Sequence, residues 1–338
     1  MTGSGREREI ARFLAGAGWG GAAVAPLAAD ASFRRYLRVR RGAETAVLMD
    51  APPEREPIAP YAAIARHLRV LGFAAPDIAA ADEAAGLLLM EDLGDHTFTR
   101  LLEGGADEAA LYELAIDTLV ALHRLDPAAA IPPGLARYSD DLLLAEAHHL
   151  LDWYLPTVGV TVGPARRTAY GERWRAAFAR ARQVPETLVL RDFHVDNLMR
   201  LGGRDGVAAC GLVDFQDAVA GPASYDFVSL VEDARRDVPP ALARSLRDRY
   251  LAAFPGLDAD AFERSCAILG AQRHCKVIGI FTRLSRRDGK DGYLGHIARV
   301  WRLLEAAVAH PALGAMRDWL DDAVPARARA VPGPEAAA

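Results

Sequence analysis

The spacing of apolar side chains divides the chain into a strand-rich first part and a helical second part. Short apolar runs typical of strands occur around residues 22–27, 34–39, 44–49 and 86–95, with helical spacing over 6–19 and 58–71. Helical spacing then dominates over about 111–122, 140–154, 164–182, 240–254, 259–284 and 293–308. The pattern predicts an α+β protein with a small β-rich N-lobe (1–93), a larger helical C-lobe (94–324) and a disordered Pro/Ala-rich tail (325–338).

Two short apolar runs within the helical part frame the most polar motif of the chain. A strand ending at Leu190 enters the loop of LVLRDFHVDNLMR, in which Asp192 and Asn197 have the spacing D-x-x-x-x-N. A second run, CGLVDF, ends at Asp214-Phe215. If the two runs are strands of one hairpin, Asp192, Asn197 and Asp214 lie at the same end of the helical lobe.

This set of side chains suits phosphoryl transfer. An aspartate can accept the proton of an attacking hydroxyl, while an amide and a carboxylate oxygen can hold Mg²⁺ against nucleotide phosphates. The spacing resembles the kinase catalytic loop followed by Asp-Phe-Gly. The alternative is a polar loop that only caps a hairpin, with Asp196-Asn197 as turn formers.

Composition and charge exclude several other classes of protein. The chain is 51% hydrophobic and 25% charged with a net charge of −5, which argues against a disordered chain and a general nucleic-acid binder. Its 3 cysteines form no CxxC motif, and no apolar run approaches a membrane span or a signal core. We therefore expect a cytoplasmic protein with no nucleic-acid, membrane or obligate protein partner.

Two residue types are rare enough to be informative. Asn197 is the single asparagine, and the only lysines are Lys276 and Lys290, so the N-lobe has none. Met49 stands where a kinase would carry its third-strand lysine. By two-residue alternation, Arg35 shares the apolar face of Phe33, Leu37 and Val39 and is expected nearest the loop, with Arg34 as the next candidate for binding phosphate.

These motifs resemble the aminoglycoside phosphotransferase/choline kinase superfamily, and more closely the anomeric N-acetylmuramate/N-acetylglucosamine kinases of bacterial cell-wall recycling. The resembling stretches include DASFRRYLRV, VLMDAPPE, MEDLGDHTF, LRDFHVDNLM and GLVDFQDAVAGPASYDF. The resemblance implies a protein-kinase-like bilobal fold, the use of ATP and Mg²⁺, and phosphate transfer to the C1 hydroxyl of an amino sugar. The sugar 1-phosphate would then lead to a UDP-sugar.

The resemblance also assigns expected roles to individual residues. Asp192 is the base, and Asn197 and Asp214 are the metal ligands. The residues expected to bind the nucleotide are Ser32, Arg34, Arg35 and three residues of the hinge beside adenine, Met90, Glu91 and Leu93. Candidates for binding the sugar are Arg191, Asp217, Trp153 and Tyr154; Asp217 is alternatively a plain loop carboxylate, and the two aromatic residues are alternatively core residues that do not stack on the sugar. Asp226 is expected to cap or anchor a helix. The cluster Arg283, Arg286 and Arg287 is either a solvated face or a contact for the carboxylate of a muramyl sugar.

Two other functions stay open at this stage. Another small-molecule kinase, acting on an aminoglycoside or choline, would share the catalytic loop, although a polycationic acceptor calls for an acidic pocket rather than an arginine cluster. A nucleotide-binding pseudokinase is suggested by Met49 alone, and the complete Asp192, Asn197 and Asp214 set argues against it.

Overall fold

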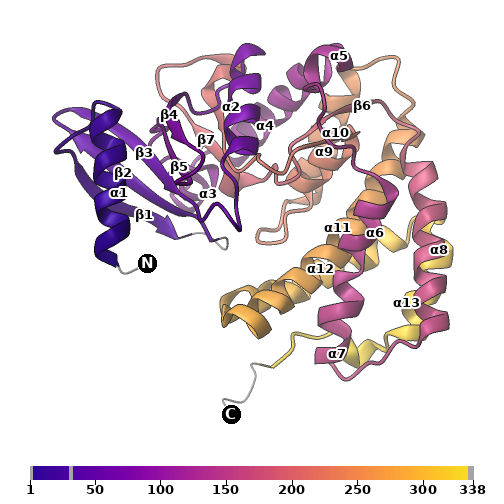
Figure 1. The fold of residues 1–338 in the computed structure, drawn as a ribbon. Helices are drawn as coiled ribbons and strands as arrows, with labels where there is room; N and C mark the ends of the chain where they lie inside the picture. Colours follow the sequence, from indigo (N-terminus) through magenta and orange to yellow (C-terminus); the bar gives the residue numbers. More distant parts are fainter. Residues whose placement is uncertain (1–2, 30–32, 334–338) are drawn as a thin grey trace. The chain divides into compact units, whose positions relative to one another are not determined.

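Two units make up the computed structural model, which describes residues 3–29 and 33–333 (Figure 1). The first unit contains the chain up to Thr118 together with Val195–Ala218, and the second contains Leu119–His194 and the chain from Val219 onward. This division differs from the expected boundary at residues 93/94, because the first unit also takes in later helices and the second half of the loop motif. The chain crosses between the units inside that motif, at His194–Val195.

A five-stranded antiparallel sheet organises the first unit. Its order is β1-β2-β3-β5-β4, with β1 Ala23–Ala29, β2 Arg35–Arg41, β3 Glu44–Asp50, β4 Ile78–Asp82 and β5 Leu87–Glu91. The predicted strands are confirmed, and β4 is an additional edge strand. Its sequence, IAAAD, has weak alternation, and its register with β5 shifts between Ile78 and Ala80, which explains why the pattern did not reveal it.

One face of the sheet is covered by helix α1 (Gly3–Gly16) (Figure 1). Ile10 and Leu14 pack with Val39, Leu48 and Leu89 in a buried cluster. Met49 points to the opposite face by strand alternation, is paired across the sheet with Tyr36 and Leu88, and is fully buried. Met49 is thus a core residue of the sheet.

The rest of the first unit is helical apart from one short ribbon. Its elements are α2 Ala59–Val70, α3 Phe98–Glu103, the start of α4 Glu108–His123, the 3₁₀ turns Val195–Asn197 and Gly206–Ala209, and strands β7 Leu198–Arg200 and β8 Cys210–Leu212. β7 and β8 pair antiparallel, with Leu198 opposite Leu212. This ribbon fixes the positions of the residues that come directly before β7 and directly after β8.

Helices form most of the second unit. They are α5 Pro127–Ala130, α6 Asp140–Ala147, α7 Leu155–Thr157, α8 Pro164–Ala181, α9 Ser224–Val231, α10 Pro240–Ala252, α11 Ala259–Asp288, α12 Ile297–Val308 and α13 Gly314–Ala323. A π-helical turn covers Leu150–Tyr154, and further 3₁₀ turns cover Asp291–His296, Pro311–Leu313 and Ala326–Ala328. The predicted helical ranges are confirmed, with shifts of a few residues at their ends.

Helix α11 is the central element of this unit, and most of its length is buried. It contacts α6, α8, α9, α12 and the π-helical turn. At Gly279 a Cβ atom would lie 2.2 Å from the backbone of His149, so glycine allows α11 to approach this turn closely. The helix is therefore a rigid support for the side chains that it carries on its other faces.

The predicted single hairpin is wrong. β6 (Glu186–Val189) pairs with β9 (Val219–Pro222) in the second unit, whereas β7 pairs with β8 in the first. Two separate ribbons, rather than two strands of one hairpin, carry the polar motif. Strand β9, with the sequence VAGP, has no alternation that could have revealed its pairing with β6.

The predicted disordered tail is also wrong for residues 325–333, and residues 334–338 lie outside the described part of the chain. The Tyr154 hydroxyl lies 2.6 Å from the carbonyl oxygen of Ala328 and 2.7 Å from that of Ala330. Arg329 forms ion pairs with Glu305 at 3.0 Å and with Asp321 at 2.6 Å. These contacts fix the segment against the second unit.

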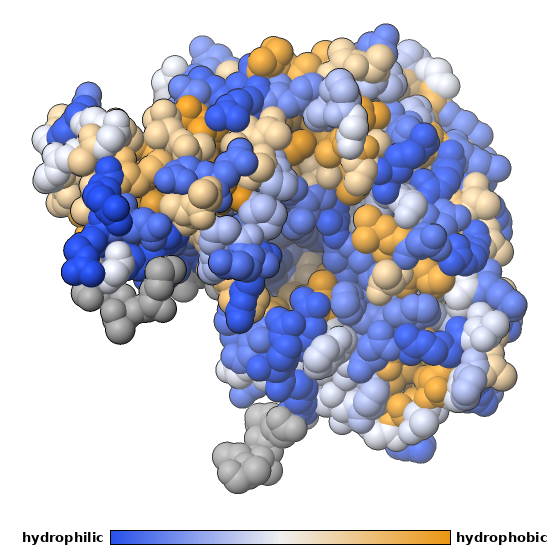
Figure 2. Space-filling view, viewed as in Figure 1, coloured by the Kyte–Doolittle hydropathy of each residue, from blue (hydrophilic) through white to orange (hydrophobic). Residues whose placement is uncertain are grey.

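One face of the surface is seen in the space-filling view. On the face seen in Figure 2, hydrophilic residues predominate and hydrophobic ones form small, separate patches. Among the described residues, no helix has both the length and the apolar character needed to cross a bilayer.

Candidate active site

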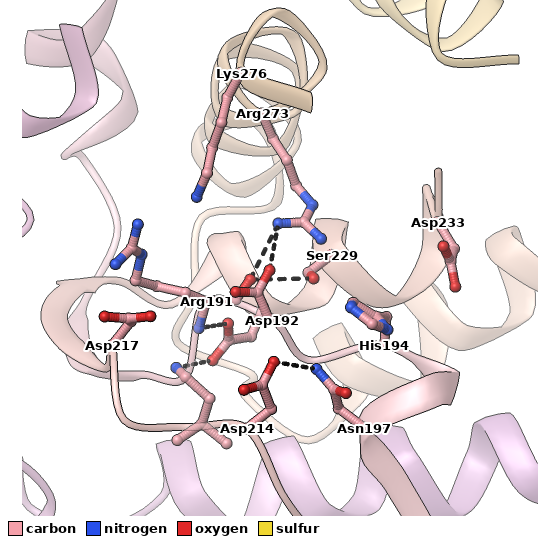
Figure 3. A network of polar contacts seen from close by, with 12 residues as sticks. Arg191, Asp192, His194, Asn197, Asp214, Asp217, Ser229, Asp233, Arg273 and Lys276 are labelled. Atoms are coloured by element: carbon pink, nitrogen blue, oxygen red, sulfur yellow. Dashed lines mark hydrogen bonds and ion pairs between the residues drawn. The ribbon is translucent and has the colours of Figure 1, made fainter. Parts of the chain in front are cut away.

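The loop that follows β6 carries Asp192, and a buried carboxylate holds this loop in place. Asp226, on α9, accepts hydrogen bonds from the backbone N–H groups of Leu190 at 2.6 Å and Arg191 at 2.9 Å (Figure 3). Burial raises the pKa of Asp226 to about 7 despite these two bonds. The expectation that Asp226 caps or anchors a helix is thus corrected, since its carboxylate anchors the loop that carries Asp192.

Backbone conformation marks the same loop. Arg191 and Asp214 have φ values of 70° and 61°, and among the described residues they are the only non-glycine ones with positive φ. Such conformations cost free energy for residues with a Cβ atom and are concentrated at functional sites. Each of the two units contributes one such position.

Asp192 is partly exposed and lies among cations of the second unit. Its side chain is 36% exposed, and Arg273 Nη1 lies 3.5 Å from Asp192 Oδ1 while donating to the Arg191 carbonyl at 3.1 Å. Burial alone would raise the pKa of Asp192, but the charges of Lys276 and Arg273 outweigh it and hold the pKa well below its usual value. The carboxylate is therefore ionised at neutral pH and can accept a hydrogen bond from a hydroxyl.

A buried carboxylate, Glu146 on α6, holds two of the neighbouring cations. Its Oε1 is paired with Arg191 and, at 3.0 Å, with Lys276 Nζ. Its Oε2 accepts hydrogen bonds from the Tyr138 hydroxyl and from Gln272 Nε2. Arg191, expected to bind sugar, is thus occupied by an ion pair that stabilises the loop.

The first unit brings together the two predicted metal ligands. Asn197 ends the 3₁₀ turn before β7, and Asp214 follows β8, so the antiparallel ribbon places them side by side. Asn197 Nδ2 donates to Asp214 Oδ2 at 3.3 Å (Figure 3), and Gln216 Nε2 donates to Asp214 Oδ1 at 2.9 Å. One amide and one carboxylate oxygen fit Mg²⁺, which keeps its other positions for phosphate oxygens and water.

An arginine of the same unit lies beside this pair. Arg34 Nη1 is 3.7 Å from Asp214 Oδ1, and Arg34 Nε forms an ion pair with Glu56 at 2.7 Å. The other oxygen of Glu56 accepts the backbone N–H of Phe33 at 2.8 Å, so the carboxylate fixes the arginine and the start of its strand together. An arginine–glutamate pair thus lies near Asn197 and Asp214, in a protein whose N-lobe has no lysine.

The expected order of the two arginines is reversed. Arg35 pairs with Asp50, and its side chain is 63% exposed, whereas that of Arg34 is 10% exposed. β2 begins at Arg35, so strand alternation did not apply to Arg34. Ser32, the third residue expected in this segment, lies outside the described residues.

The three hinge residues have different surroundings. Met90 is buried, and Glu91 forms ion pairs with Arg69 at 3.3 Å and Arg204 at 2.7 Å. Leu93 packs against a small apolar cluster made of Ala74, Met199 and Leu201. This cluster is apolar, as a binding site for a purine ring must be. Leu93, which contacts it, comes two residues after the end of β5.

The structure gives less support to the residues expected to bind the sugar. Tyr154 is fully buried and hydrogen-bonded to the 325–333 segment, so of its two alternatives it is a core residue and does not stack on a sugar. Trp153 is half-buried on the π-helical turn, and Asp217 is exposed beside Gln216. In the arginine cluster, Arg287 pairs with Asp288 and Arg286 donates to the Gly333 carbonyl. Those two side chains are engaged with the protein itself.

Four residues of the site escaped the sequence analysis: Glu56, Glu146, Arg273 and Lys276. None belongs to a motif with fixed spacing, since tertiary packing brings each to its place. One signal was available for Lys276, because a chain with 40 basic residues keeps only two lysines. A lysine retained in such a composition merited attention.

Comparison with known proteins agrees with this geometry. The model of the phosphotransferase enzyme family (APH) matches residues 23–262. An N-acetylmuramate/N-acetylglucosamine kinase of Caulobacter vibrioides is 38% identical over 96% of this chain and 99% of its own length. A protein of the same name from Pseudomonas aeruginosa is 37% identical over 86% of each chain.

Solved structures show the same fold at low sequence identity. A choline/ethanolamine kinase family protein from Mesorhizobium loti has a TM-score of 0.62 at 16% identity, covering 93% of this chain and 99% of that one. The GDP complex of aminoglycoside 2'-phosphotransferase-IIIa has a TM-score of 0.57 at 16% identity, covering 85% and 92%. The protein-kinase-like α+β fold predicted from the sequence is confirmed, and the chain belongs to the phosphotransferase enzyme family, as a relative of its N-acetylmuramate/N-acetylglucosamine kinases.

Proposed function

We propose that this protein is an ATP- and Mg²⁺-dependent kinase that phosphorylates the C1 hydroxyl of N-acetylmuramate and N-acetylglucosamine. The observation that carries the proposal is the loop of residues 190–199. Asp192 lies among cations at one end of it, and Asn197 is hydrogen-bonded to Asp214 at the other. Two relatives named N-acetylmuramate/N-acetylglucosamine kinase match 96% and 86% of the chain and support the choice of substrates. We further propose that it acts in the cytoplasm, in the recycling of peptidoglycan sugars toward UDP-sugars.

The residues of the loop and of the β7–β8 ribbon suggest how the phosphate is transferred. Asp192 accepts a hydrogen bond from the acceptor hydroxyl and takes its proton as the oxygen bonds to the γ-phosphorus and the bond to the β-phosphate oxygen breaks, releasing ADP. A carboxylate with a lowered pKa is a weak base, so Asp192 orients the hydroxyl and receives the proton late, which suits a loose transition state. Asn197 and Asp214 would hold Mg²⁺, which neutralises phosphate charge.

We expect Arg34→Ala to lower kcat/KM for ATP roughly 10- to 100-fold, since charge-assisted hydrogen bonds of about 1.5–3 kcal/mol to phosphate would be lost. Arg35→Ala is the matched control. Its neighbour Asp50 keeps Arg6 as a partner, so we expect less than about a twofold change, within the range of an exposed ion pair. Steady-state kinetics at varied ATP, with calorimetric titration of nucleotide, measure both. Equal, small effects of the two substitutions would remove Arg34 from the phosphate site.

The choice of acceptor tests the proposed function. We expect ADP release with N-acetylmuramate and N-acetylglucosamine, and none above background with their 1-O-methyl glycosides, which lack the C1 hydroxyl but keep C3, C4 and C6. Kanamycin and choline represent the alternative acceptor classes. Turnover of the methyl glycosides at the rate of the free sugars would exclude C1, and preference for kanamycin or choline would assign the protein to another kinase class.

A further inference from the structure

The strongest unassigned feature of the second unit is the ammonium group of Lys276. The side chain projects from α11 on the same side as Arg273, toward Arg191 and Asp192 (Figure 3), and is 7% exposed. An ammonium has three N–H donors. Within residues 3–29 and 33–333, Glu146 Oε1 pairs with the ammonium at 3.0 Å, and no other acceptor lies in hydrogen-bonding geometry, so one partner faces three donors.

Glu146 does not need Lys276 to remain paired. Its carboxylate is also bound by Arg191, Tyr138 and Gln272, so its buried charge keeps three other partners. Unsatisfied buried donors are costly, and proteins retain them where a ligand completes the set. Lys276 therefore supplies more hydrogen-bonding capacity than the fold uses.

The position of Lys276 points to the acceptor rather than to a distant role. Arg273, one turn earlier on α11, reaches Asp192, and the charge of Lys276 helps to lower the pKa of that carboxylate. The ammonium thus lies close to the group that would orient the reacting hydroxyl. Only residues of the second unit enter this argument.

We infer that Lys276 binds the acceptor sugar, donating hydrogen bonds to a neutral oxygen that N-acetylmuramate and N-acetylglucosamine share. This inference rests on the proposed function. A neutral oxygen common to both sugars is favoured over the muramyl carboxylate because each of these cations already faces a carboxylate: Arg191 and Lys276 pair with Glu146, and Arg273 lies against Asp192.

The test is Lys276→Met, which keeps the length of the side chain and removes its donors. We expect KM for both sugars to rise roughly 10- to 100-fold, with KM for ATP within about twofold of wild type. Calorimetric titration of N-acetylglucosamine without nucleotide should show the same loss of affinity. Lys290→Met, which removes the other lysine beyond the end of α11, is the matched control and should leave both KM values unchanged.

Several outcomes would overturn the inference. They are an unchanged sugar KM, a change confined to N-acetylmuramate, or a fall in kcat with both KM values unchanged. If Lys276→Met does not fold, Lys276→Arg is the second variant. Arginine keeps a cation against Glu146, but its larger guanidinium group cannot place N–H donors where the ammonium group places them. That variant should fold with a raised sugar KM, and a wild-type value would contradict the assignment. Wild-type enzyme that turns over neither sugar would instead refute the proposed function.

Discussion

Replacing Asp192 by asparagine is expected to lower kcat for sugar phosphorylation by roughly 10²–10⁴, the usual contribution of a positioned acid–base group. Asparagine keeps the size and one acceptor oxygen of the side chain but cannot take the hydroxyl proton. Arg273 retains its hydrogen bond to the Arg191 carbonyl, and Asp226 still holds the loop, so the variant should fold. Nucleotide affinity should stay close to that of wild type.

The measurement is steady-state turnover with saturating ATP and sugar, combined with the melting temperature and calorimetric titration of nucleotide. Asp205→Asn, in an exposed loop of the first unit, removes the same charge away from the site and should act like wild type. Retention of a third or more of the activity in Asp192→Asn would show that this carboxylate is not the base.

Loss of the Asp214 carboxylate should abolish activity. Because Asp214 has a φ of 61°, alanine would add backbone strain at this position, whereas asparagine tolerates the left-handed conformation. Asp214→Asn therefore tests the charge with little backbone strain: its amide keeps one acceptor oxygen, for Asn197 Nδ2 or for Gln216 Nε2, but it cannot neutralise a bound cation. We expect its turnover to fall to the background of the assay while its melting temperature stays near that of wild type.

The partner substitution, Asn197→Ala, should act through the metal alone. We expect the Mg²⁺ concentration for half-maximal activity to rise by roughly 10- to 100-fold, the range typical for lost support of a metal site. Titration of Mg²⁺ at fixed ATP measures this shift. If Asn197→Ala leaves the Mg²⁺ dependence unchanged, the D-x-x-x-x-N interpretation is wrong despite its spacing.

Local patterns in the sequence predicted the strands and helices that pack a continuous apolar face. The four predicted strands of the sheet and the long helix α11 carry such faces, and their existence followed from periodicity. The edge strand β4 and the strand β9 are short and rich in Ala and Gly, so their pairing depends on their neighbours rather than on their own sequence. The ordered structure of residues 325–333 could not be predicted for the same reason, because it depends on contacts of Tyr154 and Arg329 that composition cannot show.

Some residues of the site could likewise be predicted from local sequence, and others could not. Asp192, Asn197 and Asp214 could be proposed because their spacing is fixed by one loop and one short ribbon. Glu146 and Lys276 are 130 positions apart in the chain and meet only through the packing of α6 and α11. Two-residue alternation makes Arg34 a weaker candidate than Arg35 for binding phosphate. Arg34 lies one residue before the start of β2, however, and strand alternation does not hold there.

The central claim is that the phosphate is transferred to C1, and a two-dimensional ¹H–³¹P correlation of the reaction product tests it most directly. The enzyme, ATP, Mg²⁺ and N-acetylmuramate or N-acetylglucosamine are incubated together, and the new phosphomonoester is observed without separation. Transfer to the anomeric hydroxyl predicts a cross-peak from phosphorus to H1 of the sugar. A cross-peak to H3, H4 or the H6 protons, or ADP formation without any sugar phosphate, would contradict it.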